Sequence, residues 1–307
     1  MNRQEFIASC AELSEQELLS IALESRNMAA SRVPPEVQIK FRSLDGVTEA
    51  KELWEPTAFG KTHLFIVREK DLTGPLPVVV NVHGGGWSLD HTERDTYFCR
   101  RLAARLHCLV VDVDYVLAPE HPYPAALEEI EALLDCFPRL LETWNGDPSN
   151  IVFCGQSAGG NLAAAVLQRR RWASELGIKA QVLCYLPTDN YNDHFHGSEL
   201  DARGKSTEYY GFFYNRVFDE RKNSDVSILF ASDEELRRLP PTDIVTAGLD
   251  NLCEEGKAYY DRLVAVGVAG EYRCFENSRH GFLVNLYDEW QEGEDYAVNR
   301  IHAYLQH

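Results

Sequence analysis

A G-x-S-x-G pattern lies within the stretch Ile151-Val-Phe-Cys-Gly-Gln-Ser157-Ala-Gly-Gly-Asn-Leu-Ala-Ala-Ala165. The four apolar residues 151–154 predict a short buried strand, and the alanine- and leucine-rich residues 158–168 predict a helix. A sharp turn between strand and helix needs small residues, and Gly155 and Gly159 have no Cβ atoms to hold the two elements apart. The residue at the apex of this turn is Ser157, whose hydroxyl would stand beside a helix N-terminus that favours negative charge.

This pattern has two interpretations. Ser157 is an acyl-transfer nucleophile, or the pattern occurs by chance in a glycine-rich turn. The strand predicted before it and the helix predicted after it favour the nucleophile. The rest of the chain must then supply a base, an orienting acid and donors for an oxyanion.

The composition limits the classes of partner. Of the 307 residues, 48 are Asp or Glu and 30 are Lys or Arg, which gives a formal charge of −18. This charge argues against nucleic acid and anionic membrane surfaces as partners. The N-terminal residues contain no apolar core of signal-peptide length, and no run approaches a membrane span, so we expect a cytoplasmic protein. The eight cysteines are scattered without a C-x-x-C pair, which argues against a disulfide framework or a zinc site.

Strands and helices are predicted to alternate along most of the chain. Strands are expected at residues 77–82, 109–113, 151–154, 180–186, 244–247 and 271–275. Helices are expected at residues 92–107, 125–136, 158–168, 252–266 and 287–305. This alternation predicts an α/β fold with a mostly parallel central sheet that helices flank on both sides.

The N-terminal part of the chain does not follow this alternation. A helix is predicted to about Ala30, and the sequence Ser14-Glu-Gln-Glu17 fits a capping box within it. Three strands are then expected at residues 37–42, 48–54 and 62–67, with a turn at Asp45-Gly46 between the first two. We expect these strands to form an antiparallel edge of the sheet.

Residues 187–241 form a long insertion between two predicted core strands. It is rich in aromatic residues, namely Tyr191, Phe195, Tyr209, Tyr210, Phe212, Phe213, Tyr214 and Phe218. Insertions of this size are usually lids or binding elements, although aromatic residues also build an insertion's own core, and we expect both roles. We therefore predict one domain over residues 1–307, with a helical cap made from about 1–35 and about 187–241.

Polar residues that directly follow strands are the candidates for chemistry, because ligands of open α/β sheets bind at the carboxyl ends of the strands. Ser157 needs a base, and His280 follows the last predicted strand in a loop, next to Gly281. The other histidines weighed are weaker candidates, since they fall in predicted strands, helices or the C-terminal tail: His63, His107, His302 and His307.

The base in turn needs an orienting carboxylate. Asp250 comes just after the strand predicted at 244–247. Glu254 and Glu255 compete with it, although acids at that place also fit the solvated start of a helix.

An oxyanion needs backbone donors. Gly84 and Gly85, which follow a predicted buried strand, would let N–H groups point into the site, and Ala158 would add a third donor. The alternative for the glycines is a plain flexible turn.

Five motifs together resemble those of the hormone-sensitive-lipase-like family of α/β-hydrolase carboxylesterases. They are His83-Gly-Gly-Gly-Trp87, Asp114-Tyr-Val-Leu-Ala-Pro-Glu120, Gly155-Gln-Ser-Ala-Gly-Gly160, Gly248-Leu-Asp-Asn-Leu252 and His280-Gly-Phe282. The resemblance runs from roughly Pro75 to the C-terminus. It implies an α/β-hydrolase fold with a cap, and a site composed of the triad Ser157, Asp250 and His280 and an oxyanion hole from Gly84, Gly85 and Ala158.

Three positions depart from the family's pattern. Gln156 stands where the family usually has Asp, Val116 replaces the usual Arg, and Asn251 replaces the usual Pro after the triad acid. None of them removes a triad atom. We expect Gln156 to affect the pH dependence or the contacts with the alcohol group of the substrate.

The function expected from these features is hydrolysis of small soluble esters with short acyl chains, such as acetyl, and no metal or cofactor is needed. Asp193, His194 and His196 are candidate metal ligands by residue type, but an exposed cap loop is the preferred interpretation. An amidase or formamidase on the same triad stays open, as does a homo-oligomer. A third hypothesis, after the esterase and the amidase, is a non-catalytic receptor of the same fold. The presence of His280 argues against it.

Overall fold

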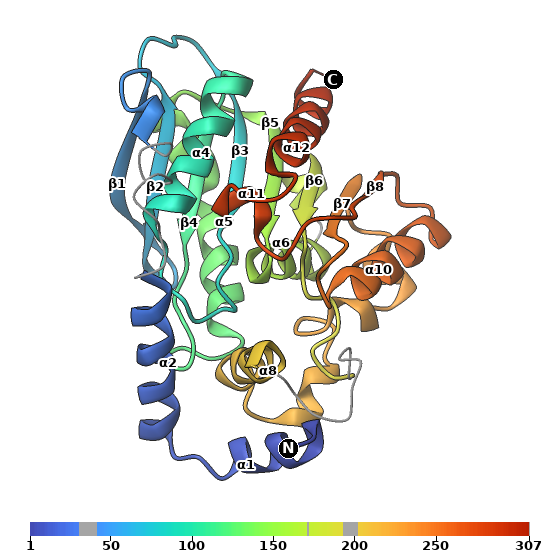
Figure 1. The fold of residues 1–307 in the computed structure, drawn as a ribbon. Helices are drawn as coiled ribbons and strands as arrows, with labels where there is room; N and C mark the ends of the chain where they lie inside the picture. The colour runs from blue at the N-terminus through green and yellow to red at the C-terminus, as the bar shows by residue number, and fades with distance from the viewer. Residues whose placement is uncertain (31–41, 171, 193–201, 307) are drawn as a thin grey trace.

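The computed structural model describes residues 1–30, 42–170, 172–192 and 202–306 (Figure 1). Eight strands of this part form one sheet in the order β1-β2-β4-β3-β5-β6-β7-β8. Their bounds are β1 Thr48–Thr57, β2 Gly60–Glu69, β3 Leu76–Val82, β4 Leu109–Asp114, β5 Gly146–Gln156, β6 Ile178–Cys184, β7 Thr242–Ala247 and β8 Tyr272–Phe275. The pairs β1–β2 and β2–β4 are antiparallel and the other five are parallel. The predicted α/β class with a mostly parallel sheet is confirmed.

The helices flank both faces of this sheet and also form a separate group at one end of it (Figure 1). Their bounds are α1 Arg3–Ala11, α2 Glu15–Ala30, α4 Glu93–Leu106, α5 Ala125–Trp144, α6 Ala158–Arg169, α7 Trp172–Glu175, α8 Ala202–Tyr214, α9 Asp233–Leu236, α10 Cys253–Ala265, α11 Phe282–Asn285 and α12 Trp290–Leu305. Three short 3-10 helices are η1 Arg42–Leu44, η2 Phe218–Lys222 and η3 Ile228–Phe230.

The central strands are buried on both faces, which explains why their sequences are continuously apolar. Val78 and Val80 of β3 pack in a core with α5, α6 and α10, and Val79 packs in the opposite core with α4, α11 and α12. Successive side chains of a strand point to opposite faces, so a run of β-branched residues fills both cores at once. The sheet therefore holds the carboxyl ends of its parallel strands at fixed positions along one edge.

Two predictions about single elements were inaccurate. Helix α5 continues past Cys136 to Trp144 with Pro138 inside it, because buried Phe137 and Leu141 extend its apolar face and this packing outweighs the lost hydrogen bond.

Residues 42–44 form η1 and not the end of a strand, and β1 pairs with β2 through the register Thr57 to Gly60. The rest of the strand predicted at 37–42 falls outside the described residues.

The N-terminal helices pack against the insertion. Phe6 of α1 lies in a small core with Phe212 of α8, and Leu18 of α2 lies in another with Phe213. The predicted capping box is present, since the Ser14 backbone N–H donates to Glu17 Oε2 at 2.8 Å. Figure 1 shows α1, α2 and α8 together at the end of the molecule away from the C-terminus.

The prediction that the insertion's aromatic residues build a core is supported at these positions. Phe195 and the histidines weighed as metal ligands lie outside the described residues. Among the helices that the structure describes, none has the length and apolar character needed to cross a membrane.

Candidate active site

Ser157 stands at the turn from β5 into α6 with φ 52° and ψ −124°, a conformation that non-glycine residues rarely adopt. The two glycines of the pattern make this turn sterically feasible. A Cβ on Gly155 would lie 2.7 Å from the carbonyl oxygen of Gly159, and a Cβ on Gly159 would lie 2.0 Å from the carbonyl oxygen of Val82. The strain at Ser157 is therefore supported by close backbone packing that only glycine permits at positions 155 and 159.

The structure brings the three side chains predicted as a triad into one hydrogen-bonded chain. His280 Nε2 lies 2.9 Å from Ser157 Oγ, and His280 Nδ1 lies 2.6 Å from Asp250 Oδ2. The residues follow β5, β7 and β8, so the carboxyl ends of three parallel strands position them. With Nδ1–H donating to the carboxylate, Nε2 is free to accept the hydroxyl proton of Ser157.

His280 is also held from its backbone and its ring face. The hydroxyl of Tyr287 donates a hydrogen bond to the carbonyl oxygen of His280. The ring of Tyr185 meets the imidazole edge to face, with the centroids 5.1 Å apart. These contacts support the backbone and the ring of His280 beside Ser157 and Asp250.

Asp250 is nearly inaccessible, with 1% of its side chain exposed. Burial disfavours its charge, but the imidazole of His280 and the guanidinium of Arg203 outweigh burial and hold the pKa of this carboxyl below its usual range. The two competing acids lie elsewhere. Glu255 accepts a hydrogen bond from the Thr188 backbone N–H at 2.6 Å, and Glu254 lies in the first turn of α10. The acid beside the imidazole is thus Asp250, as the motif order predicted.

The glycine loop after β3 lies directly against Ser157. A Cβ on Gly84 would lie 3.3 Å from the Cβ of Ser157, and Gly85 has φ 124°. In the described part of the chain, the backbone N–H groups of Gly84, Gly85 and Ala158 have no hydrogen-bond acceptor. Three unpaired donors beside a hydroxyl are the arrangement that a developing oxyanion requires.

His83 supports this loop and is not a second base. Its Nδ1 bonds to the carbonyl oxygen of Gly84 at 2.7 Å, and its ring stacks on Tyr115 with centroids 4.5 Å apart. The hydroxyl of Tyr115 donates to the carbonyl oxygen of His83 at 3.0 Å.

Gln156 is buried in the sheet and does not line the site. Its Nε2 donates to Asn81 Oδ1 at 2.9 Å, and Asn81 donates onward to Asp112 at 2.7 Å. Because Gln156 is 1% exposed, it can affect the contacts of the alcohol group only through its neighbours, and its expected effect on the pH dependence stays a prediction. The alternation of side chains along the strand also predicts that Gln156 faces the core on the α4 side, because Val152 and Cys154 face that side and Gln156 is the next residue in the series.

The backbone of Val116, the second position that departs from the family's pattern, contacts a buried acid. Glu129 Oε2 accepts a hydrogen bond from the Val116 backbone N–H at 2.6 Å. Burial raises the pKa of Glu129 to about 7.

Two residues of α8 reach the site and were not predicted as site residues. Arg203 Nη2 lies 2.5 Å from Asp250 Oδ1, and the ring of Tyr210 covers the glycine loop so closely that a Cβ on Gly86 would lie 2.4 Å from its Cγ. Tyr210 was one of the aromatic residues noted in the insertion. Nothing in the sequence around Arg203 distinguishes it from a surface arginine.

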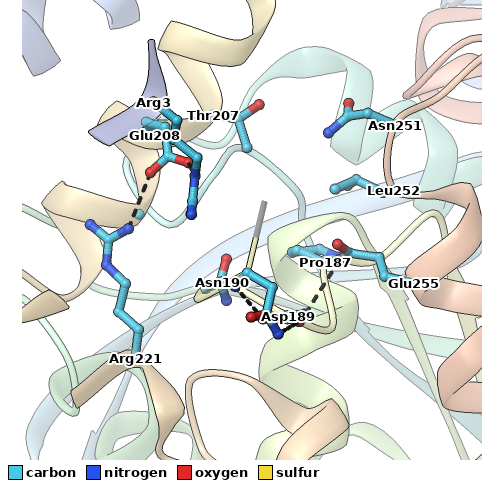
Figure 2. A pocket seen from close by; sticks show the side chains of 12 residues that line it. Arg3, Pro187, Asp189, Asn190, Thr207, Glu208, Arg221, Asn251, Leu252 and Glu255 are labelled. Atoms are coloured by element: carbon cyan, nitrogen blue, oxygen red, sulfur yellow. Dashed lines mark hydrogen bonds and ion pairs between the residues drawn. The ribbon is translucent and has the colours of Figure 1, made fainter. Parts of the chain in front are cut away.

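A narrow cavity of about 30 Å³ lies between α8 and the turn that follows Asp250 (Figure 2). Thr207 and Glu208 of α8 line it together with Asn251, and Arg3 of α1 forms an ion pair with Glu208 there. The cavity is large enough to hold water. The helix is thus seated closely against the turn that carries the acid.

The chain is similar to known proteins in both sequence and structure. A family model described as the alpha/beta hydrolase fold matches residues 79–284. Carboxylesterase NlhH of Mycobacterium tuberculosis is 31% identical over 259 residues, which cover 81% of this chain and 76% of that protein.

Two solved structures are similar over nearly the whole chain. A thermostable esterase from Pseudomonas putida superposes with a TM-score of 0.80 at 25% identity and covers 100% of this chain and 98% of its own. A hyperthermophilic esterase from Pyrobaculum calidifontis superposes with a TM-score of 0.80 at 26% identity and covers 98% of each chain.

Proposed function

Because the chain belongs to the α/β hydrolase fold family, in its hormone-sensitive-lipase-like group, we propose that it is a serine carboxylesterase that acts on small esters with short acyl chains such as acetyl. The observation that carries this proposal is the continuous hydrogen-bonded chain from Ser157 through His280 to Asp250, with unpaired backbone N–H groups beside the hydroxyl. Ester hydrolysis needs a nucleophile, a base within hydrogen-bond reach of it, and donors for the oxyanion, and the chain has residues of all three kinds at this site.

In the proposed acylation, His280 Nε2 takes the proton of Ser157 as Oγ bonds to the carbonyl carbon of the ester. The negative charge moves to the carbonyl oxygen, which accepts hydrogen bonds from the N–H groups of Gly84, Gly85 and Ala158. The imidazolium then gives its proton to the alkoxy oxygen of the ester as the bond between that oxygen and the carbonyl carbon breaks. The alcohol departs, and the acyl group stays bound to Ser157 Oγ. Asp250 stays ionised and holds the imidazole in place.

Deacylation repeats these roles with water. His280 takes a proton from a water molecule as its oxygen bonds to the acyl carbon. The tetrahedral intermediate collapses with return of the proton to Ser157 Oγ, and the carboxylic acid is released. Every proton in this scheme moves through His280, and no step calls for a metal or a cofactor.

The preference for short acyl chains is supported by the contacts of α8. Tyr210 lies on Gly86 and Tyr214 stacks on Trp87 with centroids 4.6 Å apart. These rings cover the glycine loop, and we propose that they limit the length of acyl chain that the site accepts. We propose that residues 1–35 and 187–241 act as the cap of the site, and that α8 is its innermost element.

The substrate class is tested with nitrophenyl esters of increasing acyl length and with a matched nitroanilide. We expect kcat/KM to be highest for acetyl to butyryl esters and to fall at least about tenfold for decanoyl and longer chains. A maximum on emulsified long-chain esters would contradict the proposed substrate class. Faster turnover of the anilide than of the matched ester would favour an amidase.

The pH dependence follows from the charge states of the two groups beside Ser157. Protonated His280 cannot accept a proton from Ser157. Asp250 stays ionised because its pKa is already lowered. We therefore expect log kcat/KM to fall with a slope of one toward acidic pH, since only one proton is taken up. A rate that is flat to pH 5 in folded protein would contradict His280 as the base.

The remaining parts of the proposal concern the substrate class, the cellular location and the partners of the protein. A small-molecule substrate, a cytoplasmic location and the absence of nucleic-acid or membrane partners are supported by the charge of −18 and by eight cysteines that are all free.

A further inference from the structure

One face of α8 touches three separate parts of the active site. Arg203, Tyr210 and Tyr214 are spaced at i, i+7 and i+11, which places them on one side of a helix. Arg203 contacts the turn after β7, Tyr210 covers the glycine loop, and Tyr214 stacks on Trp87, which follows that loop. The helix therefore sets the relative positions of the acid and the oxyanion donors.

The guanidinium of Arg203 binds two neighbouring acceptors at once. Nη2 lies 2.5 Å from Asp250 Oδ1, and Nε lies 3.0 Å from Asn251 Oδ1. Nε and Nη2 are adjacent donors of one rigid plane, so the two contacts fix the orientation of the group as well as its position. Asn251 stands where related sequences usually have proline, and proline has no side-chain acceptor to offer. Asn251 and Arg203 thus form one hydrogen-bonded unit beside Asp250.

We propose, on the basis of the esterase function proposed above, that Arg203 is a positioning residue that holds the Asp250 carboxylate for His280 and is itself held by Asn251. The contact occupies Oδ1 and leaves Oδ2 for the imidazole, 2.6 Å away. Without it, Oδ1 would retain only the Leu252 backbone N–H, at 3.4 Å, among its contacts with the described residues. A buried carboxylate with one oxygen poorly satisfied can rotate, and rotation would break its bond to His280.

The charge of Arg203 has a second effect, on proton uptake by the imidazole. A positive charge beside Asp250 reduces the preference of the pair for the protonated imidazole, so removing this charge moves the titration to higher pH. Two other ionisable side chains of the described residues face the pair. Tyr287 is close to both Arg203 and Asp250, and the ring of Tyr185 meets the imidazole edge to face. Because 47% of the Arg203 side chain is exposed, solvent screens this effect and the expected shift is modest.

The test compares Arg203→Met, Arg203→Lys, Asn251→Ala and the double variant Arg203→Met/Asn251→Ala. Arg237→Met is the matched control, because Arg237 is also an exposed arginine of the insertion and pairs only with Asp233 in the described residues. Two quantities are measured for each protein, namely kcat and KM on nitrophenyl acetate and the pH titration of the proton resonance between His280 Nδ1 and Asp250 by NMR. The resonance does not depend on turnover, so it reports on Arg203 even if the ester proposal fails.

We expect Arg203→Met to lower kcat about threefold to tenfold with KM nearly unchanged, and to move the titration midpoint upward by about half a pH unit. Arg203→Lys keeps the positive charge but loses the two adjacent N–H donors of the planar guanidinium. We therefore expect its titration midpoint to stay near that of the wild type while kcat still falls. Asn251→Ala should lower kcat less than Arg203→Met does, and the double variant should be no worse than Arg203→Met because both act through one contact.

Two results would overturn the inference. The first is a titration midpoint and kcat in Arg203→Met that match the wild type and Arg237→Met. The second is full additivity of the Arg203 and Asn251 effects. If wild-type protein hydrolyses no ester while Arg203→Met still shifts the resonance, the esterase proposal fails and the positioning role stands.

Discussion

Replacing Ser157 with alanine is expected to lower kcat/KM for nitrophenyl acetate at least about 10⁴-fold. The substitution removes the only atom that forms the covalent bond in the proposed mechanism, Oγ, which lies 2.9 Å from His280 Nε2. The oxyanion donors and the base remain, but without an attacking oxygen they accelerate only the direct attack of water. The measurement is a steady-state assay on enzyme purified away from host esterases.

The same variant must remain folded for the loss of activity to be informative. Alanine has a Cβ like serine, so it takes no more space at the strained position with φ 52°. We expect the free energy of unfolding to change by less than about 1 kcal/mol. A folded Ser157→Ala variant that keeps more than a few per cent of the activity would contradict the role of Ser157 as the nucleophile.

Replacing Gly159 with alanine is expected to damage both stability and activity. Alanine in the interior of an exposed helix is favoured over glycine by about 1 kcal/mol. At this position the new Cβ would lie 2.0 Å from the carbonyl oxygen of Val82 and 2.4 Å from that of His83. Both are backbone atoms at the end of a central strand and cannot rotate away. The clash therefore outweighs the helix propensity, and we expect unfolding to become about 2 kcal/mol easier.

The activity of this variant should fall by at least about 100-fold, because the clash pushes the glycine loop away from Ser157. Gly46→Ala is the matched control, since a Cβ on Gly46 meets no atom within 4 Å. Denaturant unfolding and the nitrophenyl acetate assay measure the two effects. Wild-type stability and activity in Gly159→Ala would show that the turn can relax, and would remove the steric argument for the G-x-S-x-G pattern.

Much of the fold was predictable because its signals are local. The central strands are continuous apolar runs, and the turn at Ser157 requires its two glycines within five residues. Asp250 and His280 were predictable because each is a polar residue directly after a strand, and the sheet brings such positions together. The predicted family resemblance is confirmed by the match over residues 79–284 and by the similarity to known esterases.

The parts that were missed depend on contacts between distant segments. Arg203 and Asp250 are 47 residues apart, and the packing of α8 against the loops that follow the strands brings them together. Asn251 was recognised as a departure, but its partner could not be named from sequence. The length of α5 was underestimated because a proline is a strong local signal and the packing of Phe137 and Leu141 is not.

The central claim is that Ser157 is the residue acylated by substrate, and covalent labelling tests it most directly. The protein is incubated with an alkyl phosphonate nitrophenyl ester, and intact-mass and peptide mass spectrometry locate the adduct. We predict one phosphonyl group per chain, on Ser157, with none on Ser157→Ala and protection by excess nitrophenyl acetate. A folded wild-type protein that takes up no label, or takes it up at another residue, would contradict the account.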